Sequence, residues 1–317
     1  MARLMGLCAD RLRGGSPVSD YVLGWSGDSR PQSDNVPLRL AGALHALRIE
    51  GLALEGIYPP QEVDDEALWA AVESTLLRFP KRIVLWLQSA PQTNEVLRAA
   101  VILPARALIE ERFGRPLDLF ELGASAGLNL YANQFHLPIP GATIGNSDAT
   151  VRLNPDWSGP LPPTRLATVV SRRAVDLNPL DPTDPTDQLR LLAYLWPDRM
   201  SRTRAAIGIA KVDPAKIDCG DAGDWLAEVL EAPAKTGRVV YHTVAWQYFT
   251  SETRAKVREA IENAGLCATD APPFAHLSME AEGGVGAVVK LEMWPGGASR
   301  QIAHADFHGR WVNWTGV

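Results

Sequence analysis

A short apolar segment followed by a turn of very small residues constrains the fold of this chain more than any other feature. Residues 117–122 read Leu-Asp-Leu-Phe-Glu-Leu, which predicts a strand, and residues 123–127 read Gly-Ala-Ser-Ala-Gly. Residues 128–135 are then expected to form a helix. A strand, a tight glycine turn and a helix make the opening of a βαβ unit. Because the turn residues are small, a ligand can approach their backbone and use the amides at the helix start.

The chain after residue 115 alternates between strand patterns and helix patterns. Its clearest strand is residues 238–245, and its strongest amphipathic helix is residues 252–263. Such alternation implies a mostly parallel sheet covered on both faces, whereas the end of the chain predicts an antiparallel hairpin. The other expected elements are strands at 168–177, 215–219 and 275–279, a helix at 225–230, a small hairpin around 151–153, and terminal hairpin arms at 286–294 and 302–308.

The first part of the chain reads as a mainly helical lobe. Residues 96–113 should form a helix that bends at Pro104 and ends at Gly114, because proline disturbs a helix interior and glycine suits a C-cap. We therefore expect a helical lobe over residues 1–114 and an α/β domain over residues 115–317. Further expectations are helices at 38–54 and 66–79, a loop at 14–37, strand or helix at 83–87, and a helix at 187–211 broken near Pro197.

Composition excludes several classes of partner. The formal net charge is -6 and no cluster of Lys and Arg is present, which argues against nucleic-acid binding. The three cysteines are scattered and the six histidines lack ligand spacing, so we expect no disulfide framework and no metal site. No apolar run approaches the roughly 20 residues that span a bilayer, and the amino terminus does not read as a signal peptide. We expect a cytoplasmic protein with a small-molecule substrate and leave its oligomeric state open.

The small-residue turn has more than one interpretation. It can be the loop that binds a cofactor, or a tight turn without a ligand. It also matches G-x-S-x-G, the nucleophile elbow of α/β-hydrolases, which would make Ser125 a nucleophile. The acid could then be Asp221 and the base His242, His276, His304 or His308. The hydrolase interpretation is disfavoured because several strands precede the elbow in that fold, whereas the preceding residues here read as helical.

Six motifs together resemble a large bacterial family of uncharacterised proteins, a domain of unknown function with a methyltransferase-like fold. They are Pro-Gln-Thr-Asn-Glu-Val at 91–96, the segment 121–130, Arg-Ala-Val-Asp-Leu-Asn-Pro-Leu-Asp at 173–181, Leu-Trp-Pro at 195–197, Gly-Asp at 220–221 and Val-Tyr-His-Thr at 240–243. The resemblance covers nearly the whole chain. It implies a Rossmann-like sheet of the methyltransferase type over residues 115–317 and S-adenosylmethionine as the cofactor.

The resemblance also implies roles for individual residues. Asp176 is expected to bind the ribose hydroxyls and Asp221 the adenine amino group, although both also suit turns or helix caps. Ser125 stands where methyltransferases commonly have a second glycine. The expected cofactor-binding residues are Glu121, Gly123, Ala124, Ser125, Gly127, Asn129, Asp176 and Asp221.

The expected reaction is methyl transfer to a small molecule, with an α/β-hydrolase-like esterase or a non-catalytic nucleotide-type binding protein as alternatives. His242, near the end of the clearest strand, is the first candidate base and Glu95 the second. Gln92 and Asn94 are candidate substrate contacts, and Trp246, followed by Tyr248 and Phe249, could wall an apolar pocket. The alternatives are a core histidine, helix capping at residues 92–95 and plain core aromatics.

Overall fold

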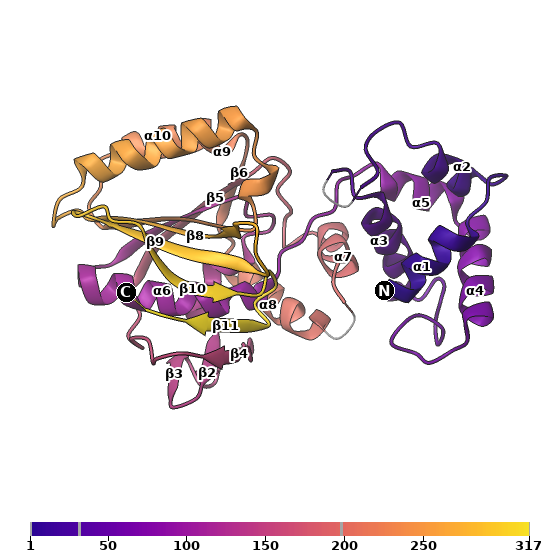
Figure 1. The fold of residues 1–317 in the computed structure, drawn as a ribbon, viewed down its shortest axis with the longest axis horizontal. Helices are drawn as coiled ribbons and strands as arrows, with labels where there is room; N and C mark the ends of the chain where they lie inside the picture. The colour runs from indigo at the N-terminus through magenta and orange to yellow at the C-terminus, as the bar shows by residue number, and fades with distance from the viewer. Residues whose placement is uncertain (1, 31–32, 197–198, 317) are drawn as a thin grey trace. The chain divides into compact units, whose positions relative to one another are not determined.

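The computed structural model describes residues 2–30, 33–196 and 199–316, which fold into two compact units (Figure 1). The first, the helical unit, comprises residues 1–93 and 183–204. The second, the sheet unit, comprises residues 94–182 and 205–317. The division therefore does not fall at residue 114, as the sequence suggested. Helix α6 (Ala99–Phe113) packs against strands of the sheet and belongs to the sheet unit.

The helical unit is a small bundle with an apolar core. Two of its helices begin after capping residues: the Ser16 hydroxyl accepts a hydrogen bond from Ser19 N, and the Asp64 carboxylate accepts one from Ala67 N. The ring of His45 joins two helices, because its Nδ1 lies 3.0 Å from the carbonyl oxygen of Ala193. The helices are α1 (Ala2–Arg11), α2 (Pro17–Leu23), α3 (Val36–Ile49), α4 (Asp65–Arg78), α5 (Pro80–Leu87) and α7 (Pro185–Ala193).

A sheet of nine strands, as far as the structure describes the chain, forms the centre of the sheet unit. Its order is β4-β11-β10-β9-β8-β7-β1-β5-β6, and the five strands from β8 to β6 are parallel. Strands β9, β10 and β11 continue it in antiparallel pairs, and β4 pairs parallel with β11. The strands are β1 (Leu117–Leu122), β4 (Asp156–Ser158), β5 (Val169–Asp176), β6 (Lys216–Cys219), β7 (Gly237–Thr243), β8 (Phe274–Ala281), β9 (Ala287–Trp294), β10 (Arg300–Ala305) and β11 (Trp311–Trp314).

The parallel strands stand in the Rossmann order. Strands β5 and β6 lie on one side of β1 and strands β7 and β8 on the other, so the order reverses beside β1, and ligands bind at such a point outside the carboxyl ends of the strands. The expected fold class, a Rossmann-like α/β sheet that is mostly parallel with antiparallel strands at its C-terminal end, is confirmed.

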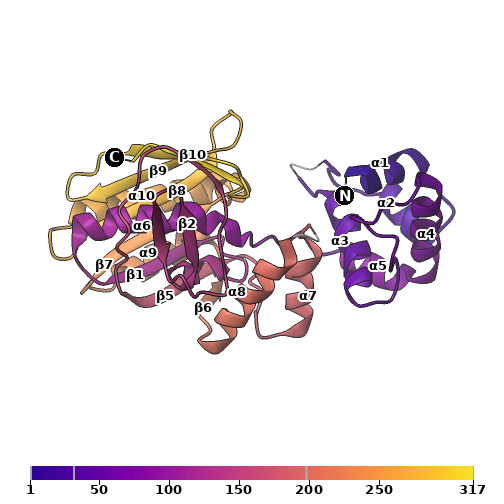
Figure 2. The same ribbon diagram turned by 90° about the horizontal axis from the view of Figure 1, so that it is seen from below.

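Helices cover both faces of the sheet (Figures 1 and 2). Helices α9 (Ala222–Glu231) and α10 (Ser251–Cys267) lie on one face, where Trp225 and Val257 pack with Phe120 and Val240. Helix α6 lies on the other face. Helix α8 (Met200–Val212) precedes β6. Cover on both faces explains why the central strands β1 and β7 are buried along almost their whole length.

Several local expectations meet a different outcome. Residues 128–135 do not form an α-helix: η2 (Leu128–Gln134) is a 3-10 helix, and the chain is already extended at Phe135, just before β2 (His136–Ile139) begins. The small hairpin consists of β2 and β3 (Ala142–Gly145), whereas Arg152 forms only a bridge to His136. Residues 14–37 contain α2, and residues 83–87 belong to α5.

The C-cap predicted at Gly114 is confirmed, whereas the bend predicted at Pro104 stays a prediction. Pro104 sits inside α6, and Gly114 caps that helix in the left-handed conformation with φ 58°. Pro197, where a helix break was expected, lies outside the described residues.

Candidate functional site

The loop after β1 closes over the end of β5. Gly123, Ser125 and Gly127 all have left-handed backbone, with φ of 68°, 54° and 63°. Glycine adopts this conformation freely, whereas for serine it is an uncommon one. Gly123 N and Ala124 N both donate hydrogen bonds to the carbonyl oxygen of Val175. The loop amides are thus used to anchor the loop to the sheet.

Asp176 ends β5 and ties down the same loop. Its Oδ2 accepts a hydrogen bond from Ser125 N at 2.8 Å, and its Oδ1 accepts one from Asn178 N at 2.9 Å. An ionised carboxylate has about four acceptor positions in all. Asp176 therefore keeps acceptor capacity for a ligand after holding the loop.

Asp221 follows β6 and is the N-cap of α9. Its Oδ1 accepts hydrogen bonds from Gly223 N at 2.8 Å and Asp224 N at 3.2 Å, and its Oδ2 accepts one from the Thr253 hydroxyl. Burial on its own would raise the pKa of Asp221, but these hydrogen bonds outweigh it and lower the pKa. Asp221 is consequently an ionised acceptor at neutral pH.

A cavity of about 300 Å³ opens at the carboxyl ends of the parallel strands. Gly123 after β1, Asp176 at the end of β5 and Asp221 after β6 all line it. Three of the residues expected to bind the cofactor thus meet in one place, although they lie far apart in the sequence. The segment after β7 and the start of α10 supply the opposite wall, which includes Tyr248, Phe249, Thr250, Glu252, Thr253 and Lys256.

The lining of this cavity is acidic. Asp176, Asp221, Asp224 and Glu252 contribute carboxylates, and the described lining contains one lysine, Lys256. Lys256 Nζ lies 2.8 Å from Asp224 Oδ1 and 3.0 Å from Glu252 Oε1, so two carboxylates already share its charge. The cavity therefore favours neutral or cationic groups over anionic ones.

Glu121 is held away from the cavity lining. It is buried, and its Oε2 accepts a hydrogen bond from the Tyr241 hydroxyl at 3.2 Å. Burial raises the pKa of Glu121 to about 8, while the Tyr241 hydrogen bond and the Arg98 charge oppose that rise. This acid was expected to bind the cofactor, and the structure gives it partners inside the protein.

His242 lies in a buried polar cluster with partners on both ring nitrogens. Its Nδ1 is 2.7 Å from Glu280 Oε1, and its Nε2 is 3.2 Å from His276 Nε2. Its ring stacks on Trp246, with ring centroids 5.1 Å apart. Burial, and then the neighbouring His242, lower the pKa of His276 to about 3, so His276 is neutral at ordinary pH. His242 does not belong to the described lining of the 300 Å³ cavity.

Glu280 is a member of this cluster that the sequence did not indicate. Its Oε1 also accepts hydrogen bonds from Ala245 N at 3.0 Å and Trp246 N at 3.2 Å. It thereby fixes the start of the segment that carries Tyr248 and Phe249 to the cavity. In the register between β7 and β8, His242 pairs with Ser278, two residues before Glu280. This register brings the Glu280 carboxylate to His242, and no local pattern reveals it.

Asn94 and Glu95 form hydrogen bonds with the residues that follow the loop 123–127. Asn94 Oδ1 accepts the hydrogen bond of Leu128 N at 2.9 Å and so caps η2. Asn129 Nδ2 donates to the carbonyl oxygen of Glu95 at 3.3 Å, and the Glu95 carboxylate accepts from Leu97 N at 3.1 Å. Asn94, Glu95 and Asn129 are all buried. Asn94 and Glu95 thus make capping contacts, in keeping with the capping alternative for residues 92–95. The roles of Asn94, Glu95 and Asn129 toward a substrate or cofactor stay predictions.

Two further predicted contacts lie outside the cavity. Gln92 is half-buried and belongs to the helical unit. Trp246 is half-buried and packs on His242 and Phe249, whereas its neighbours Tyr248 and Phe249 reach the cavity. The cavity is also lined by Glu252, Thr253 and Lys256. No local pattern indicates these residues, because they face the cavity only through the packing of α10.

The hydrolase interpretation lacks its catalytic contacts. The left-handed backbone of Ser125 does resemble a nucleophile elbow. However, its hydroxyl is buried and, among the described residues, has no hydrogen-bond partner. A serine nucleophile needs a base within hydrogen-bond reach. The nitrogens of His242 face Glu280 and His276 instead.

Within the described residues, no group of three or more His, Cys, Asp or Glu side chains is arranged to hold a metal ion. No described helix has the length and apolarity that crossing a membrane requires.

Comparison with known proteins shows a family and a distant structural similarity. The family model described as "Uncharacterized protein conserved in bacteria (DUF2332)" matches residues 1–314. Among the curated proteins, none matches the sequence. The chain is similar in structure to the plantazolicin methyltransferase BamL, whose crystal structure contains a triazolic desmethylPZN analog and SAH. That match has 10% identity and a TM-score of 0.29, and it covers 78% of this chain and 60% of the other.

Proposed function

We propose that this chain, which belongs to the DUF2332 family of bacterial proteins, is an S-adenosylmethionine-dependent methyltransferase that acts on a small molecule. One observation supports this most directly. The cavity at the carboxyl edge of the sheet brings together Gly123, Asp176 and Asp221, which follow the first, second and third parallel strands. In a Rossmann-like sheet this is the position at which a nucleoside is bound.

The residues present suit an adenosyl group. A side chain at Gly123 would begin 2.7 Å from the Ala245 Cβ and close to the Phe249 ring, so only glycine keeps this edge of the cavity open. Asp176 retains acceptor positions for ribose hydroxyls, and Asp221 can accept a hydrogen bond from an adenine amino group. Phe249 offers an apolar surface on the same wall.

The charge of the site argues for this cofactor over phosphate-bearing nucleotides. Enzymes that bind NAD or ATP present free loop amides and basic side chains to the phosphates. Here Gly123 N, Ala124 N and Ser125 N bond to β5, and the cavity is lined by carboxylates. Adenosine with a cationic sulfonium and amino group fits such a lining better than a di- or triphosphate does.

Bound S-adenosylmethionine would supply an electrophilic methyl group, so the protein's main task is alignment. The loop of residues 123–127 and the Phe249 wall would fix the position of the adenosyl group. His242 and Glu95 remain the predicted bases. Both are buried and hydrogen-bonded within the protein. His242 has partners on both ring nitrogens, so a substrate would have to displace one of them to exchange a proton with it.

Calorimetric titration tests the proposal. S-adenosylhomocysteine should bind the wild-type protein, whereas ATP and NAD should not. Gly123→Val, which fills the cavity edge, should weaken binding by at least about tenfold, equivalent to roughly 1.4 kcal/mol. Glu282→Gln, at an exposed ion pair with Lys290, is the matched control and should bind normally. Equal binding by the Gly123→Val variant, or tighter binding of ATP than of S-adenosylhomocysteine, would refute the proposal.

Turnover separates the remaining alternatives. A protein that binds S-adenosylhomocysteine but never consumes S-adenosylmethionine in the presence of candidate acceptors would be a binding protein rather than an enzyme. Labelling of Ser125 by a fluorophosphonate in the folded protein would instead revive the esterase interpretation.

A further inference from the structure

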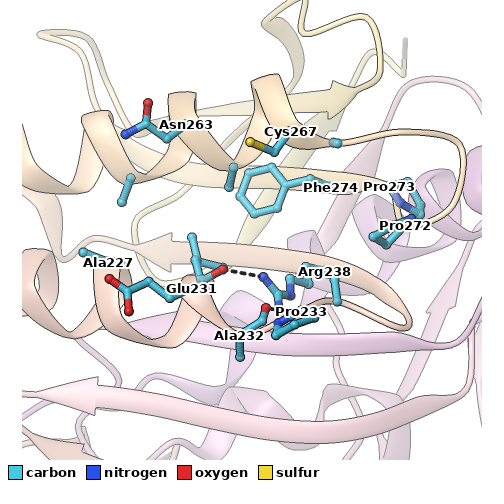
Figure 3. A pocket seen from close by; sticks show the side chains of 15 residues that line it. Ala227, Glu231, Ala232, Pro233, Arg238, Asn263, Cys267, Pro272, Pro273 and Phe274 are labelled. Carbon is cyan, nitrogen blue, oxygen red and sulfur yellow. Dashed lines mark hydrogen bonds between the residues drawn. The ribbon is translucent and has the colours of Figure 1, made fainter.

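A second and larger cavity lies at the opposite edge of the sheet (Figure 3). Its volume is about 510 Å³, within the range of small-molecule sites. It is built by the C-terminal halves of α9 and α10 and by the starts of β7 and β8. Since the proposed cofactor cavity opens at the carboxyl ends of the parallel strands, the two cavities are separate, and no described residue lines both.

Small side chains explain why this space is open. Near their C-terminal ends, α9 and α10 face each other with alanines such as Ala227, Ala260 and Ala264. The Phe274 ring, at the start of β8, forms an apolar wall between the two helices (Figure 3). The linkers that follow the helices carry prolines, which restrict their backbones. The walls are therefore apolar and largely preformed.

Arg238 is the cation in the described lining of this cavity. Its Nη1 donates to the carbonyl oxygen of Leu230 at 2.9 Å and its Nη2 to that of Ala232, so the end of α9 fixes the guanidinium. Among the described residues, no carboxylate lies within ion-pair distance of it. Burial lowers the pKa of Arg238, while the charge of Asp118 raises it, and Asp118 already accepts hydrogen bonds from two hydroxyls.

Among the described residues, no carboxylate pairs with the remaining donors of Arg238. A guanidinium has five N–H donors, and two carbonyl oxygens use only part of them. Glu231 is the acid in the described lining, and its exposed carboxylate points away from Arg238 in Figure 3. A half-buried cation beside an apolar cavity is best satisfied by a carboxylate with an apolar body.

We propose that this cavity is a second ligand site, which binds a small carboxylic acid with a flat apolar body and pairs its carboxylate with Arg238. The apolar part would lie against Phe274 and the alanines of α9 and α10. Such a site does not depend on the identity of the cofactor at the other edge of the sheet.

Titration with 2-naphthoate, with 2-naphthamide as the uncharged match, tests the proposal. Calorimetry should detect binding of the acid and much weaker binding of the amide. Arg238→Gln should weaken binding of the acid about tenfold or more, because a charge-assisted hydrogen bond is lost. Ala264→Leu should abolish binding by filling the cavity, while Arg238 stays in place. This second variant keeps the test valid even if Arg238→Gln fails to fold.

Cysteine modification locates the binding site. Cys267 lines the cavity, and Cys219, which is also exposed, is not in its lining, so iodoacetamide labelling followed by mass spectrometry carries its own control. At ten times its dissociation constant, 2-naphthoate should slow labelling of Cys267 about tenfold and leave Cys219 unchanged. The absence of binding, equal binding of acid and amide, or binding without protection of Cys267 would each overturn the proposal.

Discussion

Glu121 shows how the fold sets the charge of a single residue. Its burial raises its pKa to about 8, far above the ordinary value of 4.5. The folded protein therefore holds this proton over a pH range in which the unfolded chain releases it. As pH rises from about 4.5 to 8, the stabilising contribution of the protonated carboxyl is progressively lost.

The variant Glu121→Gln isolates this effect, because glutamine can still accept the Tyr241 hydrogen bond but does not titrate. Between pH 5 and 8, the free energy of unfolding of the wild type should fall relative to that of the variant. The difference should change by at most about 1.4 kcal/mol per pH unit. Urea denaturation without ligand, repeated across this range, measures it.

The pH dependence of the wild type must be compared with that of Glu121→Gln, because His276 changes the free energy of unfolding with pH in the opposite direction. Its pKa is lowered to about 3, so the protein loses stability as pH falls from about 6.5 to 3. The two contributions partly cancel near pH 5 to 6 in the wild type. A difference between wild type and Glu121→Gln that stays constant with pH would show that Glu121 is ionised in the folded protein.

The sequence predicts some of these residues and not others for a physical reason. Gly123, Asp176 and Asp221 each follow a strand, and the carboxyl ends of parallel strands meet at one edge, so their convergence follows from the order of elements. The bonds of Glu121 to Tyr241 and of His242 to Glu280 depend on strand register instead. Register is set by packing of the whole sheet and cannot be derived from any one strand.

At the scale of elements, strong local patterns predict well and long-range pairings do not. Strand β7 and helix α10 were foreseen from their own residues. Strand β4 has three residues and exists because it pairs with β11, more than 150 positions away. Helix α2 lies in a segment that was expected to be a loop. Its start is nevertheless marked in the sequence by Ser16 as N-cap and Pro17 at the first helical position.

Gly42 in α3 gives a prediction in which packing opposes helix propensity. Replacing a helical glycine by alanine usually stabilises a protein by about 0.4–1 kcal/mol. However, a Cβ at Gly42 would overlap the ring of Tyr194, which is buried and hydrogen-bonded to Trp86 Nε1. Gly42→Ala should therefore destabilise the protein, by about 1–3 kcal/mol.

Gly6 in α1 provides the matched control in the same unit. A Cβ there has no described atom within 4 Å, so Gly6→Ala should stabilise the protein by the usual amount. Chemical denaturation of both variants against the wild type gives the two signs. If Gly42→Ala is as stable as Gly6→Ala, Tyr194 does not pack on α3 in the way described.

At the scale of the whole molecule, the chain leaves the helical unit and returns to it. Residues 183–204 come after β5, a strand of the sheet unit, yet they cluster with residues 1–93. The contacts are specific: α7 packs on α3, His45 bonds to Ala193, and Trp86 bonds to Tyr194. A single boundary in the sequence cannot describe a unit made of two separate segments. The predicted boundary at residue 114 therefore could not match the observed division.

The discontinuous unit makes a prediction about fragments. Residues 1–93 alone would expose the surface that α7 covers and leave the Trp86 indole N–H without its partner, so they should be only partly helical and melt without a sharp transition. Adding a peptide of residues 183–204 should raise the helical circular dichroism signal and restore a cooperative melt. The same peptide with Tyr194→Ala should do so only weakly, because it loses both the hydrogen bond and the ring packed against Gly42. A fragment of residues 1–93 that melts cooperatively without any peptide would show that α7 is not part of this unit's core.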